Sequence, residues 1–259
     1  AGPVERVQPQ EHAALLAQRV EALLVNVPLD DRLAEQLRAL ASPVPVLFID
    51  VSPAAQVNSL VFNAAQGARL GVEHLLSLGH QRIALLSGPE SSVSARARLA
   101  GWKATLAEAG LEPIALAYGD WSAACGYEKG HLLLSAVELP DAILVANDQM
   151  ALGVMRACAE KGISIPGQIS VVGFDDTADS AWFSPPLTTV RQAFREAGEQ
   201  SVEWLLAPTQ GEECWQVQLP VTLVTRHSSA RRVPQQAEYE DLAQQLRSLA
   251  LRAEQLARK

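Results

Sequence analysis

The chain has 259 residues, of which 48% are hydrophobic, and it carries a formal net charge of −8. This length provides for one or two domains with buried cores. The negative net charge argues against a chain that binds DNA or RNA by itself, because phosphate contacts require clustered Lys and Arg. No stretch of the sequence approaches the roughly 20 apolar residues of a membrane-spanning helix.

Helical and strand patterns alternate along the chain. Helical signals occupy residues 9–19, 30–41, 66–78, 93–109, 123–135 and 149–161. Short runs rich in Val, Ile and Leu lie between them, at 22–25, 44–49, 82–87, 114–118, 142–146 and 170–174. Runs that are apolar on both faces and separated by helices predict an α/β fold with a parallel sheet covered on both sides.

Four of these apolar runs end at a short polar side chain. Asn26 follows ALLV, Asp50 follows VLFI, Asn147 follows AILVA and Asp175 follows SVVGF. In an open α/β sheet, ligands bind beyond the carboxyl ends of the strands. We therefore expect the four side chains, each able to hold a hydroxyl group such as that of a sugar, to meet in one small-molecule site, although Asn26 and Asp50 could also be simple turn acceptors.

Two of the acceptors have an acidic neighbour. The pair Asn147-Asp148 opens a helix, so one of the two is expected to be its N-cap. We assign the cap to Asp148 and the ligand contact to Asn147. In the pair Asp175-Asp176, we assign the ligand contact to Asp175 because it is nearer to the strand end.

Arg98 and Trp121 are expected to complete the site. Arg98 lies four residues after Ser94, so both side chains project from one helical face. Its planar fork of donors suits neighbouring hydroxyl groups, although a solvated arginine is the alternative. Trp121, in the turn Gly-Asp-Trp-Ser, would form a flat apolar wall beneath a sugar ring, and a core-edge aromatic is the alternative.

The end of the chain has a different pattern. Leu242, Leu246, Leu249 and Leu256, with Ala253 between the last two, follow the 4-3 spacing of a heptad seam on a polar helix over 238–259. The polar segment 231–237 before it is interpreted as a linker. The helix could dock on its own domain, but a narrow Leu seam favours pairing with copies of itself. About three heptads are marginal for two strands, so a larger bundle is favoured.

The sequence does not indicate an enzyme. It lacks the motifs GxSxG, GxxxxGK[ST], GxGxxG and HExxH, and His74 and His80 are six residues apart, which does not suit a metal site. Asp50 and Asp175 could be a glycosidase pair, but we expect both to stay ionised, since nothing in the sequence indicates a pocket that raises either pKa. No catalysis, cofactor or metal is expected.

Cysteine usage and the first residues indicate the compartment. Cys125, Cys158 and Cys214 form no CxxC pair and are odd in number, which favours free thiols in a reducing environment. The start AGPVERVQPQ has neither the charged nor the apolar region of a secretory signal. We expect a cytoplasmic location.

Several segments, spread over most of the chain, carry motifs that occur together in one family. They are VNVPLDD, FIDVS, GVEHLLSLGHQRIALLSGP, SSVSARARLAGW, GDWSA, LVANDQMALGVMRA, ISVVGFDDT, PPLTTVRQAFREAG and the leucine tail. GFDDT is widespread among sugar-responsive repressors, whereas GDWS, SVSARxRLAGW and the heptads together are more specific. The chain therefore resembles the lactose-repressor family, up to about Thr225 and again in the tail.

The resemblance implies a two-lobed core like that of periplasmic binding proteins. The N-terminal lobe would comprise 1–62 and 194–221, and the C-terminal lobe 63–193 and 222–230. Besides the residues named above, the ligand site would then include Phe62, Ser92, Ser94, Gln192 and Phe194. The family member compared has a leucine where Ala197 stands, so looser packing is expected at that edge of the site.

The resemblance also implies a function. The chain would be the core of a repressor that senses a sugar, with a β-galactoside as the expected ligand, and that assembles into dimers and tetramers. A sugar-binding protein of a transport system is the alternative, but such a receptor works as a monomer and has no use for the tail. Operator DNA would be bound through an N-terminal helix-turn-helix.

The chain departs from the family at its start. We find no signal for a helix-turn-helix or for the hinge helix that follows it, and no counterpart of the first core strand, the first core helix and the second core strand. The first residues resemble the helix before the third strand of the core. We therefore expect a fragment, or a gene model that starts too far downstream.

Overall fold

The computed structural model describes residues 20–27, 29–136, 138–207, 214–233 and 246–247. The helix expected at 9–19 lies outside the described residues, as do Leu242, Leu249 and Leu256. Of the tail, Leu246 and Arg247 are described; both are helical, and Leu246 is 57% exposed. The expected coiled coil therefore stays a prediction.

The larger of two sheets has six strands in the order β10-β8-β7-β6-β4-β5. In chain order they are β4 (Ile83–Ser87), β5 (Ala115–Tyr118), β6 (Ala142–Val145), β7 (Ser170–Asp175), β8 (Thr188–Gln192) and β10 (Val221–Val224). All neighbouring strands are parallel except β10, which is antiparallel to β8.

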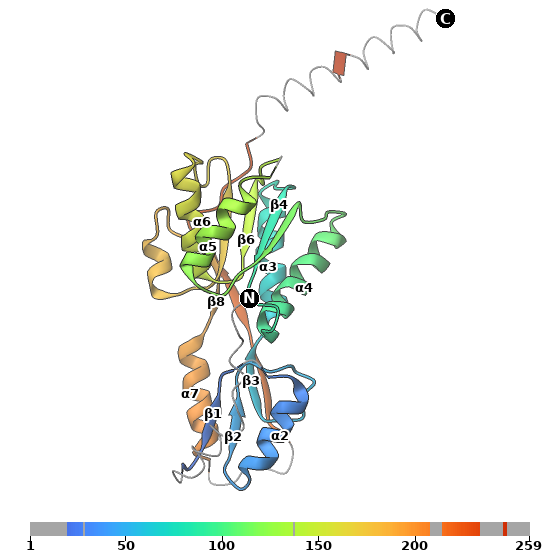
Figure 1. The fold of residues 1–259 in the computed structure, drawn as a ribbon, viewed down its shortest axis with the longest axis vertical. Coiled ribbons are helices and arrows are strands. Elements are labelled where there is room, and N and C mark those ends of the chain that lie inside the picture. The colour runs from blue at the N-terminus through green and yellow to red at the C-terminus, as the bar shows by residue number, and fades with distance from the viewer. Residues whose placement is uncertain (1–19, 28, 137, 208–213, 234–245, 248–259) are drawn as a thin grey trace, which may run out of the picture.

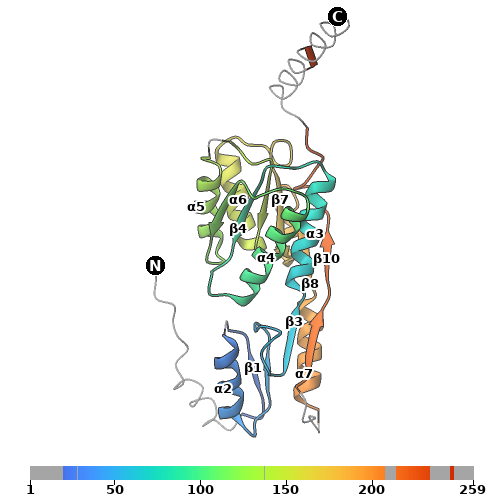
Figure 2. The same cartoon turned by 90° about the vertical axis from the view of Figure 1, so that its right-hand side faces the viewer.

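Helices cover both faces of this sheet (Figures 1 and 2). One face carries α3 (Ala64–Ser77) and α4 (Val93–Glu108), and the other carries α5 (Ala123–Leu133) and α6 (Asp148–Glu160). The short 3-10 helix η1 (Ala178–Trp182) follows β7. The largest hydrophobic core cluster lies between these layers and includes Trp102, Leu106 and Ile143.

The smaller sheet has four parallel strands in the order β1-β2-β3-β9. They are β1 (Leu23–Val25), β2 (Val46–Phe48), β3 (Ser59–Phe62) and β9 (Gln216–Leu219). Helices α2 (Asp31–Ala41) and α7 (Phe194–Leu205) lie on opposite faces of it (Figure 1). The two sheets form two lobes, so the prediction of an α/β fold with parallel sheets is confirmed.

The chain passes between the lobes at three described points, namely from β3 to α3, from β8 to α7 and from β9 to β10. At the first point, the Asn63 side chain accepts a hydrogen bond from Gln66 N at 3.0 Å and so caps α3. The helix buries Ala68, Val72 and Leu75, and Gly79 (φ +87°) follows its end. The local sequence thus determines both ends of α3, and its first residue lies at the crossing.

The elements expected from the sequence are present within the described residues, with ends that differ by a few residues. The strands β3, β8, β9 and β10 and the helices η1 and α7 were not assigned from the sequence. No helix in the described part of the chain is long and apolar enough to cross a membrane.

Candidate ligand-binding cleft

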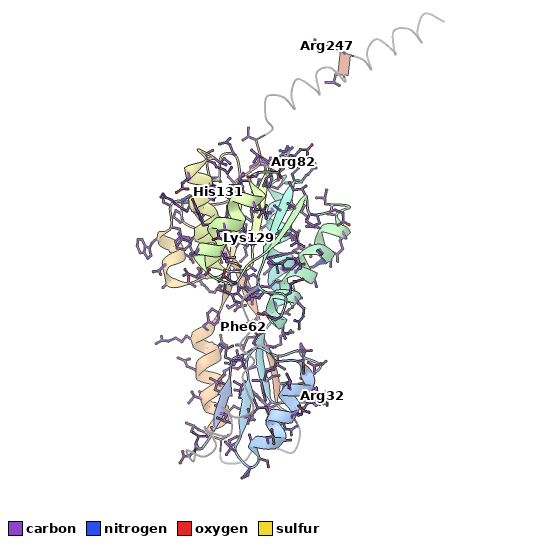
Figure 3. All side chains as sticks on the ribbon, in the orientation of Figure 1. Arg32, Phe62, Arg82, Lys129, His131 and Arg247 are labelled. Carbon is purple, nitrogen blue, oxygen red and sulfur yellow. The ribbon has the colours of Figure 1, made fainter. Side chains whose placement is uncertain are left out.

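A cleft of about 490 Å³ receives side chains from both lobes. Its lining includes every residue that the sequence predicted as a ligand contact, namely Asn26, Asp50, Phe62, Ser92, Ser94, Arg98, Trp121, Asn147, Asp175, Gln192 and Phe194. Phe62 lies at the waist between the lobes (Figure 3). The size is within the range of 300–1,000 Å³ that is usual for small-molecule pockets.

Four further residues line the cleft, namely Ile49, Ala64, Ala197 and Gly198. Ile49 directly precedes Asp50, so its position at the strand end was a usable signal. For Ala197, the resemblance predicts only looser packing at the edge of the site. Ala64 and Gly198 have no functional group, and no sequence signal marks them as part of a site.

Arg98 is the buried cation of the cleft. Its Nη1 donates to the carbonyl oxygen of Ala146, and its Nη2 lies 3.5 Å from Asp175 Oδ1. The guanidinium stacks over the ring of Phe174, with Cζ 3.9 Å from the ring centroid. Nε is buried and has no hydrogen-bond partner among the residues that the structure describes. Arg98 is therefore held in place and is not a solvated arginine.

The start of α4 joins the two lobes. The Ser92 side chain caps this helix by accepting a hydrogen bond from Ala95 N at 3.2 Å, and Ser92 Oγ lies 3.0 Å from Ser94 Oγ. From the other lobe, Asp50 Oδ1 accepts a hydrogen bond from Ser94 N at 3.3 Å. A carboxylate at a helix N-terminus also interacts favourably with the helix dipole.

Trp121 forms one wall. It has a positive φ of 77°, and a Cβ added at Gly88 would lie 2.3 Å from its Cη2 atom. The indole therefore packs directly on the Gly88 backbone, where only glycine fits. Asn147 Nδ2 donates to the Trp121 carbonyl oxygen at 3.0 Å, which fixes the wall relative to α6.

The predicted division of roles between Asn147 and Asp148 is wrong in part. Asn147 is the N-cap of α6, because its Oδ1 accepts a hydrogen bond from Met150 N at 2.9 Å. Asp148 is fully buried and accepts hydrogen bonds from Thr177 N, Ser180 Oγ and Thr189 Oγ1. Asn147 nevertheless lines the cleft, and its amide nitrogen donates one of its two hydrogens to the Trp121 carbonyl.

Asp175 is the carboxylate of the pair that lines the cleft. Asp176 pairs instead with Arg191 at 2.6 Å and with Arg226 at 2.5 Å. Asp175 has a φ of 117°, in a region that residues with a Cβ rarely adopt.

The expectation that burial would not raise the pKa of Asp50 or Asp175 is wrong. Desolvation by burial raises the pKa of Asp175 to about 7, and the positive charge of Arg98 opposes the shift. Desolvation also raises the pKa of Asp50, opposed by its hydrogen bond from Ser94 and by the charge of Arg98. The same burial lowers the pKa of Arg98, while the nearby carboxylates raise it.

The remaining residues frame the cleft at the crossings. Phe62 at the end of β3 meets Phe194 at the start of α7 edge to face, with ring centroids 5.2 Å apart. Gln192 ends β8 and is buried, while Asn26 follows β1 and is exposed. Within the described residues, no group of three or more His, Cys, Asp or Glu is placed to hold a metal ion.

Similarity to known proteins defines the structural class of the chain. Residues 72–229 match the family of the periplasmic binding protein-like domain. A structure of the lac repressor dimer bound to operator and the anti-inducer ONPF has a TM-score of 0.81 at 50% identity, over 85% of this chain and 78% of that chain. The two lobes and the cleft between them thus form a core of this class.

Sequence relatives narrow the class to one family. The lactose operon repressor of Escherichia coli (strain K12) is 50% identical over 243 residues, which is 93% of this chain and 68% of the repressor. That of Klebsiella pneumoniae is 43% identical over 216 residues, which is 83% of this chain and 61% of the repressor. The chain belongs to the lactose-repressor family of transcriptional regulators, as the sequence motifs predicted.

Proposed function

We propose that this chain is the sugar-sensing core of a transcriptional repressor and that its cleft binds a β-galactoside. The observation that carries the proposal is the meeting of Arg98, Asp50, Asp175 and Asn147 beside the indole of Trp121 in one cleft between two lobes. A pyranose has a polar rim of hydroxyl groups and an apolar face of C–H groups. The cleft offers donors and acceptors for the rim and an aromatic wall for the face.

Each polar group has a defined part in this proposal. Arg98 donates to ring hydroxyls, since its remaining N–H groups are held in place by the bond to Ala146 and the stack on Phe174. Asp175 and Asp50 accept hydrogen bonds from hydroxyls on the two sides of the cleft. Asn147 donates the second hydrogen of its amide. No covalent step is proposed, so the carboxylates bind and do not catalyse.

The sugar acts by stabilising one arrangement of the lobes. It bridges residues from both lobes, so its affinity depends on their spacing, and a ligand shifts an equilibrium only by its different affinities for the two states. In a dimer, a change in lobe arrangement alters the spacing of two DNA-binding headpieces and weakens operator binding. In this proposal the operator is bound through a helix-turn-helix.

Solved relatives support a sensor over a transport protein. Structures at 51% identity describe the lac repressor bound to ONPG in a repressed state and to the anti-inducer ONPF in an induced state, so that one core is known in two states. A structure at 28% identity is a complex of the transcriptional regulator CelR with cellobiose. We place the chain with these regulators, in the cytoplasm.

The assembly is part of the proposal. We propose a homodimer, which the tail joins into a tetramer. On the C-terminal lobe, Trp182 is 85% exposed and Leu152 is 40% exposed. Asp148 ties η1 to the first turn of α6 through Ser180, so these two side chains belong to neighbouring elements. Exposed apolar side chains on two neighbouring elements support the proposed dimer.

Calorimetry measures whether the proposed ligand binds and how tightly. We expect methyl β-galactoside to bind and glucose not to bind. Asp175→Ala should weaken galactoside binding by about 1.5–3 kcal/mol, because it leaves hydroxyl donors unpaired. Glu112→Gln, an exposed acid outside the cleft, is the matched control and should bind like the wild type. Full affinity in Asp175→Ala would contradict the site assignment, and binding of glucose alone would contradict the ligand.

A further inference from the structure

Residues 230–233 lead out of the C-terminal lobe toward the tail, at the end of this lobe that is far from the N-terminal lobe (Figure 1). Two contacts of Arg232 bind this stretch to the lobe. Its backbone N–H donates to the carbonyl oxygen of Leu78 at 2.8 Å, and its Nε lies 2.9 Å from Oδ2 of Asp141. The stretch is therefore fixed to the end of α3 and to the residue before β6.

His80 lies beside this stretch, and both of its ring nitrogens face acceptors. Nε2 is 3.0 Å from the carbonyl oxygen of Ala230, and Nδ1 is 3.3 Å from Oδ1 of Asp141. The side chain is 3% exposed, and Nδ1 has no partner other than this carboxylate among the described residues. A carbonyl and a carboxylate only accept, so both contacts become hydrogen bonds only when each ring nitrogen carries a hydrogen. The surroundings thus suit the protonated form of the ring.

Asp141 keeps its negative charge in this cluster. Its carboxylate accepts hydrogen bonds from the backbone N–H groups of Gln81 at 3.3 Å and of Arg82 at 3.2 Å. Desolvation by burial raises the pKa of Asp141, but the interaction with His80 and these backbone hydrogen bonds outweigh it, so the pKa lies below its ordinary value. Near neutral pH, histidine is therefore the group of this cluster whose charge changes.

The other titratable groups around His80 are Arg82, Arg232 and His74. The two arginines line a cavity of about 50 Å³ together with His80 and Asp141, and this cavity is large enough for a water molecule to carry a proton to the ring. His74 lies on α3, and desolvation and the charge of His80 lower its pKa. Its Nε2 is 2.8 Å from a serine hydroxyl, which pairs with a neutral ring as well as with a charged one.

We propose that His80, Asp141 and Arg232 form a pH-sensitive latch that binds residues 230–233 to the C-terminal lobe and opens as the pH rises above neutral. A neutral His80 leaves either Asp141 or the carbonyl of Ala230 without a donor. The closed latch binds the proton more tightly than the open one, so loss of the proton favours opening. Opening adds about 13 Å to the reach of the tail, since four extended residues span this length. The latch lies outside the cleft and does not depend on the proposed ligand.

Hydrogen exchange of the full chain, followed by mass spectrometry, tests the latch. The protection of the Arg232 amide is divided by that of the β6 amides, after each rate is corrected for the intrinsic effect of pH. We expect this ratio to fall about three- to tenfold from pH 6 to pH 8, as for the loss of one hydrogen bond. A ratio that stays constant would overturn the proposal, because any loss of protection would then belong to the whole lobe.

Variants assign the effect to one ring. In His80→Gln, the ratio should be the same at both pH values, because the amide does not titrate. His227→Gln changes an exposed histidine of the same segment, and it should keep the wild-type pH dependence, as should His74→Gln. Asp141→Asn should lower the ratio at both pH values, because the charge that holds His80 and Arg232 is lost. A pH dependence that persists in His80→Gln, or one that disappears in His74→Gln or His227→Gln instead, would overturn the assignment.

Discussion

Asp175 combines a strained backbone with a buried carboxyl. Its φ of 117° lies where a Cβ is unfavourable, and burial raises the pKa of its carboxyl to about 7. Arg98, 3.5 Å away, offsets only part of the desolvation. Backbone strain and desolvated charged groups are common in ligand sites, because a ligand can bind the polar groups that folding leaves without partners.

This carboxyl should make the stability of the protein depend on pH. Its folded pKa is above its unfolded value, so the folded state binds more protons between about pH 4 and pH 7, and stability falls as the pH rises through that window. Asp175→Asn removes the effect. From pH 5 to pH 8, we expect the wild type to lose about 2 kcal/mol of unfolding free energy relative to this variant.

Urea denaturation at the two pH values measures the difference. Asp179→Asn, an exposed acid in η1, is the control and should follow the wild-type profile. Parallel pH profiles of the wild type and Asp175→Asn would show that the folded carboxyl titrates near its ordinary value.

At the residue scale, the sequence located the site better than it described its chemistry. The rule that ligands lie beyond strand ends predicted the positions of Asp50, Asn147 and Asp175. The choice of cap between Asn147 and Asp148 depended on three donors, from Thr177, Ser180 and Thr189, which only the fold brings to Asp148. The raised pKa values of Asp50 and Asp175 likewise come from burial between the lobes, which no local sequence pattern indicates.

A close contact between α5 and α6 fixes one wall of the cleft. A Cβ added at Gly153 of α6 would lie 2.1 Å from the carbonyl oxygen of Ala123 in α5, so these helices meet backbone to backbone. Trp121 lies just before α5, and Asn147 caps α6 and binds the Trp121 carbonyl. The spacing of α5 and α6 therefore sets the distance between the aromatic wall and the amide.

Gly153→Ala should separate these helices. Backbone atoms cannot yield as a flexible side chain does, so we expect the unfolding free energy to fall by about 2–3 kcal/mol. The matched control is Gly198→Ala in α7, where the new methyl group meets nothing within 4 Å. That change should raise stability by about 0.5–1 kcal/mol, since alanine favours helix. Equal stabilities of the two variants in denaturant titrations would contradict the packing argument.

The helices and strands that the sequence predicted share a clear apolar pattern, and those it missed do not. In β8, the buried residues Thr188 and Thr189 are polar and bond to Ser229 and Asp148, so the strand did not look like a core strand. In α7, only Ala197 and Ser201 are buried, and neither stands out in a charged segment. Hydrogen bonds to residues distant in the sequence hold β8, and contacts of small side chains hold α7, so neither element shows an apolar pattern.

At the scale of the whole molecule, the tail should determine the number of subunits. We expect deletion of residues 238–259 to convert tetramers into dimers, because each buried leucine of the seam contributes about 1.5–3 kcal/mol. Sugar affinity should not change, since neither of the described tail residues, Leu246 and Arg247, lines the cleft. Light scattering with and without the tail measures the mass, and an unchanged mass would mean that the helix docks on its own subunit.

The positions of β9 and β10 have a consequence for synthesis on the ribosome. β9 ends at Leu219 and β10 begins at Val221, yet β9 completes an edge of one sheet and β10 an edge of the other. Neither lobe is finished until this short stretch, late in the chain, has been translated. The folding of both lobes therefore requires the same few residues. A nascent chain that stops before Gln216 leaves an unpaired edge in each of the two sheets, and both edges are then open to aggregation.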